Sequence, residues 1–108
     1  MAFDPFAALA DPIRREVLTR LAGAADGLAA GVLAEGIAIA QPSFSKHLRV
    51  LRDAGLVTAR RDGRRRVYRL EPAAIRPVLD WVRHFDRFWD GSFDALGEHL
   101  AERSPASD

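Results

Sequence analysis

The sequence predicts a mainly α-helical fold with a small β-hairpin. Three observations predict it: apolar residues recur at helical spacing, an Asp-Gly pair lies between two short β-type runs, and proline or glycine separates the segments. At 108 residues and 48% hydrophobic, the chain is long enough to bury one core. We therefore expect one domain, residues 1–103, followed by a frayed tail of small and polar residues, 104–108.

Two helices are expected first, because an acid followed by proline occurs twice near the start. Asp4-Pro5 and Asp11-Pro12 each place an N-cap carboxylate before a proline in the first helical turn. A short helix therefore precedes a longer one, whose apolar face consists of Ile13, Val17, Leu18 and Leu21. The apolar spacing between Leu28 and Ile37 then predicts another short helix, joined to the next one by a tight turn.

The next segment, residues 41–54, is predicted to form an amphipathic helix of about four turns. Its apolar stripe consists of Phe44, Leu48, Leu51 and, past the turn, Leu56. Pro42 suits the first helical position, and Gly55 suits the left-handed position just past the end. The outer face is polar and basic: Ser43, Ser45, Lys46, His47, Arg49 and Arg52.

A two-stranded hairpin is expected at residues 57–70, because Asp62-Gly63 is a strong signal for a two-residue turn. With that turn, Arg61 lies opposite Arg64 and Arg60 lies opposite Arg65. Like charges directly opposed destabilise a hairpin, so folding alone gives no reason for them. Phosphates of a polyanion would turn this repulsion into binding energy.

The charge is unevenly distributed, although the net charge is only +1. From Lys46 to Arg66 eight basic residues stand against two acidic ones, a balance of +6. From Val78 onward three arginines stand against seven acids, a balance of −4. This asymmetry indicates one half that binds a polyanion and another that stays away from it.

From Pro77 to about Arg103 the chain is predicted to form one helix, roughly 40 Å long, which Gly91 can bend or interrupt. This length exceeds what one small domain can cover, so its apolar face fits a dimer interface better than an internal core. That face consists of Val78, Trp81, Val82, Phe85, Phe88, Trp89, Phe93, Leu96 and Leu100.

Composition and motifs disfavour other classes of function. Without cysteine, the chain has no disulfide, thiolate metal site or thiol nucleophile. Residues 1–12 lack the basic start and long apolar run of a signal peptide, so we expect a soluble, cytoplasmic protein without a membrane partner. No nucleophile elbow, phosphate loop or ligand cluster is present, so we expect neither an enzyme nor a cofactor.

The order of these elements is that of a winged helix-turn-helix with a long C-terminal dimerisation helix, and the residues resemble the ArsR/SmtB family of bacterial repressors. ADPIRREVLTRL looks like the opening helix of that family, QPSFSKHLRVLRDAGLV like its recognition helix, and RRDGRRRVYRL like its wing. The resemblance covers nearly the whole chain. It implies a homodimeric transcriptional repressor that binds double-stranded DNA sequence-specifically at an inverted-repeat operator.

The resemblance also implies roles for individual residues. The residues facing the major groove would be Gln41, Pro42, Ser43, Ser45, Lys46 and His47. Arg49 and Arg52 would bind phosphates. The wing would contact the neighbouring backbone or the minor groove through Arg60, Arg61, Arg64, Arg65 and Arg66. The implied dimer interface consists of Phe3, Phe6, Val78, Trp81, Val82, Phe85, Phe88, Trp89, Phe93, Leu96 and Leu100.

The sequence departs from the family pattern in ways that bear on its effector. Ala40 stands where members often have Ser, so the N-cap side-chain bond is absent. The metalloid-sensing cysteine motif is also absent, which excludes thiolate sensing. The candidate ligands for zinc, nickel or cobalt are Asp80, His84, His99 and Glu102. A metal-responsive repressor and a winged-helix protein-interaction module that does not bind DNA are the alternatives, and a metal or small-molecule effector is left open.

Overall fold

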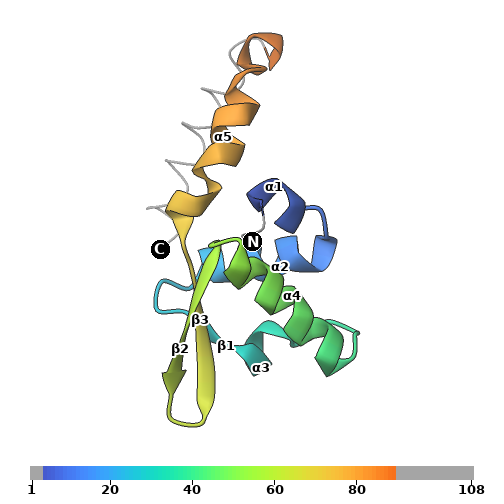
Figure 1. Ribbon diagram of the computed structural model, residues 1–108, viewed down its shortest axis with the longest axis vertical. Coiled ribbons are helices and arrows are strands. Elements are labelled where there is room, and N and C mark those ends of the chain that lie inside the picture. Colours follow the sequence, from blue (N-terminus) through green and yellow to red (C-terminus); the bar gives the residue numbers. More distant parts are fainter. Residues whose placement is uncertain (1–3, 90–108) are drawn as a thin grey trace. The chain divides into compact units, whose positions relative to one another are not determined.

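The computed structural model describes residues 4–89, and within this range no helix is long and apolar enough to cross a membrane. The chain divides into two compact units, one ending at Arg76 and the other beginning at Pro77. Figure 1 shows the elements of both units along the chain.

Helices α1 (Pro5–Ala8) and α2 (Pro12–Ala22) begin at the two predicted acid-proline pairs. The Asp4 carboxylate accepts the N–H of Phe6 at 3.0 Å. The Asp11 carboxylate accepts the N–H groups of Ile13 at 2.7 Å and Arg14 at 3.3 Å. Each cap satisfies N–H groups that have no partner within the helix, a contribution of about 1 kcal/mol.

The helix predicted between Leu28 and Ile37 is wrong in its first part. Leu28–Ala29 forms a short strand, β1, and the helix that follows, α3, is limited to Ala30–Leu33. Gly27 permits this, because its φ is +91° and a Cβ there would lie 2.6 Å from the Tyr68 carbonyl oxygen. Backbone pairing with β3 therefore overrides the helical spacing of the apolar residues.

Helix α4 (Gln41–Asp53) confirms the predicted amphipathic helix, although Pro42 is its second residue instead of its first and the helix ends one residue before position 54. Phe44, Leu48 and Leu51 are buried, as the spacing predicts. Ala40 is the N-cap and makes no side-chain bond, also as predicted. Gly55, with a φ of +77°, ends the helix and turns the chain into the sheet.

Strands β2 (Val57–Asp62) and β3 (Arg65–Leu70) form the predicted hairpin, but β1 adds a third antiparallel strand in the order β1-β3-β2 (Figure 1). The two-stranded prediction is therefore wrong. The predicted register is wrong too: Arg61 lies opposite Arg66, and Arg60 lies opposite Val67.

The physical reason for the register lies at the turn. Gly63 has a φ of +66° and takes the first loop position, so Gly63 and Arg64 connect the strands in place of Asp62 and Gly63. Asp62 stays in its strand opposite Arg65, where the two side chains form an ion pair at 3.4 Å. One pair of opposed arginines, Arg61 and Arg66, remains.

The core of the first unit is apolar and lies between the helices and one face of the sheet. Helix α2 contacts both α4 and β3, while α3 contacts β3 and α4 contacts β2. The buried cluster consists of Ala8, Val17, Leu18, Leu21, Leu33, Phe44, Leu48, Leu51, Leu56, Val57 and Tyr68. This packing holds the polar face of α4 outward.

After the 3₁₀ turn η1 (Pro72–Ile75), helix α5 runs only from Arg76 to Arg83, followed by a turn and the 3₁₀ segment η2 (Asp86–Trp89). The prediction of an uninterrupted α-helix from Pro77 is therefore wrong at His84. The ring of His84 bonds the Asp80 carbonyl at 3.0 Å through Nδ1, while its backbone N–H binds the Trp81 carbonyl. The side chain competes for the acceptor that a continuing α-helix would use. Gly91, the rest of the predicted helix and the tail lie outside the described residues.

Candidate nucleic-acid interface

The outer face of α4 presents polar and basic side chains to solvent. Seven of the predicted DNA-binding residues on this helix are exposed: Gln41, Pro42, Ser43, Ser45, Lys46, Arg49 and Arg52. They are exposed because the buried stripe of the helix faces the core and leaves the opposite side free. A helix with such a face has the size and the hydrogen-bonding groups to enter a major groove.

The wing, residues 57–70, presents its five arginines to solvent as well: Arg60, Arg61, Arg64, Arg65 and Arg66. The guanidinium of Arg60 lies 3.5 Å from the Asp26 carbonyl oxygen. The ion pair between Arg65 and Asp62 is well exposed to solvent, so it contributes little to the stability of the hairpin. Within residues 4–89, Arg61, Arg64 and Arg66 have no ion-pair partner, and their charges are available to phosphates.

A surface hollow of about 570 Å³ lies where the wing meets the segment from β1 to α3. It is lined by Ala29, Ala30, Gly31, Val32, Glu35, Arg64, Arg65 and Arg66. Sequence reasoning missed it, because only the pairing of β1 with β3 brings residues 29–35 beside the wing. Three guanidinium groups beside one carboxylate make this hollow suited to an anionic strand.

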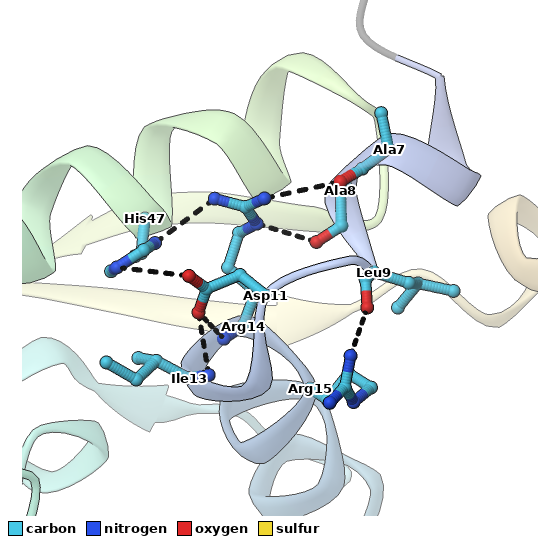
Figure 2. A network of polar contacts seen from close by, with 8 residues as sticks. All are labelled: Ala7, Ala8, Leu9, Asp11, Ile13, Arg14, Arg15 and His47. Carbon is cyan, nitrogen blue, oxygen red and sulfur yellow. Dashed lines mark hydrogen bonds and ion pairs between the residues drawn. The ribbon is translucent and has the colours of Figure 1, made fainter.

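His47 differs from the other residues assigned to the groove. Its side chain is only 19% exposed, and Figure 2 shows its ring turned towards the start of α2. Nη1 of Arg14 lies 3.2 Å from Nδ1 of His47, and Oδ2 of Asp11 lies 3.9 Å from Nε2. The only signal in the sequence is that His47 precedes buried Leu48, at the border of the apolar stripe.

Arg14 joins three helices through one guanidinium group, which sequence reasoning also missed (Figure 2). Its Nε donates to the Ala8 carbonyl at 2.6 Å, and its Nη2 donates to the Ala7 carbonyl at 3.2 Å. Its third contact is the ring of His47. The side chain of the neighbouring Arg15 donates to the end of α1, at the Leu9 carbonyl, 2.7 Å away.

Asp11 stays ionised in this network. Partial burial raises the pKa of its carboxyl, but the N–H groups of Ile13 and Arg14 and the positive charge of Arg14 outweigh that effect. The pKa of Asp11 therefore lies below its ordinary value. The carboxylate is held at the N-terminus of α2, where the helix dipole also favours negative charge.

The described part of the predicted dimer interface is rich in exposed aromatic side chains. Trp81 is 53% exposed and Phe88 is 67% exposed, and the rings of Trp81 and Phe85 meet edge to face with centroids 5.2 Å apart. Phe6 and Trp89 are exposed, whereas Val78 and Val82 are partly buried. Phe3, Phe93, Leu96 and Leu100 lie outside the described residues.

Of the four candidate metal ligands, Asp80 and His84 lie within the described residues and two lie outside them. His84 uses its Nδ1 for the backbone carbonyls of Asp80 and Trp81. Among residues 4–89 no group of three or more His, Asp or Glu side chains could hold a metal ion. His99 and Glu102 lie outside that range.

Comparisons with known proteins agree with this arrangement. A helix-turn-helix domain family matches residues 9–60. The chain is 46% identical over 85 residues to the HTH-type transcriptional regulator Rv2034 of Mycobacterium tuberculosis, covering 76% of this chain and 72% of that protein. It is 34% identical over 80 residues to the transcriptional repressor SdpR of Bacillus subtilis, covering 74% of this chain and 87% of the repressor.

Solved structures show the same architecture. The crystal structure of the ArsR family transcriptional regulator RHA00566 is similar with a TM-score of 0.68 and 35% identity, over 79% of this chain and 91% of that one. The solution structure of a homodimeric winged helix-turn-helix DNA-binding domain from Mycobacterium bovis, a possible ArsR-family regulator, is similar with a TM-score of 0.59 and 28% identity. That match covers 75% of this chain and 76% of the domain.

Proposed function

Because the chain belongs to the ArsR family of winged helix-turn-helix transcriptional regulators, we propose that it is a homodimeric repressor that binds an inverted-repeat operator in the cytoplasm. The observation that carries this proposal is the exposed polar and basic face of α4 beside an arginine-rich wing. No catalytic role is proposed for any residue.

In this proposal α4 enters the major groove. Base edges are read by side chains that can donate or accept hydrogen bonds there: Gln41, Ser43, Ser45 and Lys46. Pro42 begins the helix at the groove, and Arg49 and Arg52 bind phosphates and set the register. The reading set omits His47 because its ring lies against α2.

The wing binds the neighbouring backbone or the minor groove without reading sequence. Arg64 and Arg66 line the hollow beside α3, where a phosphate would meet two guanidinium groups without an ion-pair partner among residues 4–89. Arg60, Arg61 and Arg65 add positive charge along the same hairpin. Phosphates would also relieve the repulsion between the opposed Arg61 and Arg66.

Two copies associate through the aromatic residues of the second unit, with Phe6 and the predicted partners outside the described residues adding to the interface. The exposure of Trp81 and Phe88 in a single chain supports this, because monomeric proteins seldom leave such aromatic clusters open. A two-fold dimer would place its recognition helices in successive major grooves about 34 to 36 Å apart.

The test is to select bound fragments from the source genome, with and without divalent metals, and to measure affinity for the selected operator against salt. If the dimer neutralises about eight phosphates, the logarithm of the binding constant should fall with the logarithm of the salt concentration at a slope of about −7. Failure to bind any fragment at low salt would favour the protein-interaction module. A change of affinity on adding zinc would favour the metal-responsive repressor.

A further inference from the structure

We propose that Arg14 is a positioning residue for the recognition helix: it fixes α4 through the ring of His47, with the Asp11 carboxylate facing the ring from the other side. The inference rests on the proposed function, because it concerns the orientation in which α4 meets DNA. It assigns a role to three side chains, none of which reads a base. Figure 2 shows the three together.

The geometry of the guanidinium makes this contact directional. Its N–H donors lie in one plane at fixed angles, so two bonds determine where the third donor points. Nε and Nη2 are held by the Ala8 and Ala7 carbonyls at the end of α1. Nη1 is thereby aimed at Nδ1 of His47, 3.2 Å away.

The same contact determines which tautomer of the neutral histidine ring fits beside Arg14. A guanidinium can only donate, so Nδ1 of His47 must accept, and a neutral ring then carries its proton on Nε2. Nε2 faces Oδ2 of Asp11 at 3.9 Å. Oδ1 of Asp11 is itself held by the N–H groups at the start of α2, so the ring lies between two fixed groups.

The contact between Arg14 and His47 gives α4 a directional constraint that the apolar core does not provide. Phe44, Leu48 and Leu51 hold α4 by apolar packing, which resists separation but has little directional preference. A hydrogen bond at the middle of α4 resists rotation of the helix about its own axis. Such rotation would move Ser43 and Lys46 relative to the base edges, so loss of the bond should weaken operator recognition.

Positioning by His47 and base reading by His47 predict different patterns of loss. A histidine that reads a base affects one operator position, whereas one that positions α4 affects all positions read by the helix. The ring has both nitrogens turned towards α2 and little exposed surface. We therefore expect His47→Gln to reduce discrimination at every read position by similar factors.

The central experiment compares Arg14→Ala with Arg15→Ala on selected operator and on random DNA. Both variants remove one positive charge and bonds to the end of α1 from the same turn of α2, two bonds for Arg14 and one for Arg15, but only Arg14 reaches α4. Loss of a charge-assisted hydrogen bond should make Arg14→Ala about tenfold weaker on operator than Arg15→Ala. Random DNA should be bound equally by the two variants. Equal affinities of both variants for operator would overturn the proposal.

Two further measurements remain informative if Arg14→Ala folds poorly. In His47→Asn the amide oxygen can accept the hydrogen bond from Arg14 near the position of Nδ1, so this variant should bind operator within about threefold of the wild-type affinity. His47→Gln should lose more than that. Nitrogen-15 NMR of the wild-type protein at neutral pH should show Nδ1 of His47 unprotonated. A protonated Nδ1 in the neutral ring, or equal losses for the Asn and Gln variants, would contradict the assigned geometry.

Failure of this inference can be told apart from failure of the proposed function. If wild-type protein binds no genomic fragment, the DNA-binding function fails. If wild-type protein binds operator and Arg14→Ala binds it as well as Arg15→Ala does, only the positioning role fails. A double variant of Arg14 and His47 should lose no more affinity than the worse single variant, and fully additive losses would also refute coupling between the two.

Discussion

Replacing Arg64 and Arg66 together by alanine should weaken DNA binding and at the same time stabilise the hairpin. Both side chains are exposed, and neither has an ion-pair partner among residues 4–89. A dimer would lose four charges at the wing. Since each phosphate contact contributes about 0.9 to the salt slope, the slope should change from about −7 to about −3.5. Operator and random DNA should be affected alike, because phosphate contacts carry no sequence information.

The same double substitution is expected to leave the folding stability unchanged or to raise it slightly. Arg66 lies directly opposite Arg61 in the β2–β3 register, and like charges opposed in a sheet cost about 0.2 to 1 kcal/mol. The double variant should therefore be as stable as wild type or slightly more stable in chemical denaturation. Fluorescence anisotropy across a salt series measures the slope, and Arg69→Ala, an exposed arginine on β3 away from the turn, is the matched control. An unchanged salt slope, or a loss confined to operator, would refute the reasoning.

Three other changes test separate parts of the structure. Trp81→Ala combined with Trp89→Ala should yield monomers in sedimentation, and unchanged dimers would place the interface elsewhere. Ala40→Ser should supply the missing N-cap of α4 and raise the free energy of unfolding by about 0.5 to 1 kcal/mol; no increase would mean that the serine hydroxyl does not cap the helix. Because the folded pKa of Asp11 is lowered, its contribution to stability is present above the unfolded pKa and is lost as pH falls through the folded pKa. Asp11→Asn keeps a capping oxygen but removes this titration, so the advantage of wild type should shrink on acidification, and an advantage independent of pH would contradict the pKa shift.

Local signals explain which elements could be predicted from the sequence. The starts of α1 and α2 follow from Asp4 and Asp11, each of which bonds N–H groups within three residues. The bounds of α4 follow from its apolar spacing, from Pro42 and from Gly55, all read within one segment. Exposure of the basic residues on α4 follows from the same periodicity. The candidate interface was therefore largely predictable as a set of residues.

What the sequence did not reveal depends on partners that are distant along the chain. β1 became a strand because it pairs with residues 67 and 68 of β3, and no local pattern reports such a partner. The hairpin register was decided by the conformation of Gly63, which places Gly63 and Arg64 in the two-residue turn. The end of α5 was decided by the bond of the His84 ring to the Asp80 carbonyl.

By itself, then, the sequence determined the helices that begin and end on local signals, the hairpin, and the face of α4 that solvent would meet. Tertiary structure alone decided that His47 belongs to a contact with Arg14 and Asp11 instead of to the open face. Periodicity placed His47 at the border of the apolar stripe, where a side chain can turn either way. The hydrogen bond that turned it inward comes from a residue 33 positions earlier in the chain, which only the packing of α2 against α4 brings within reach.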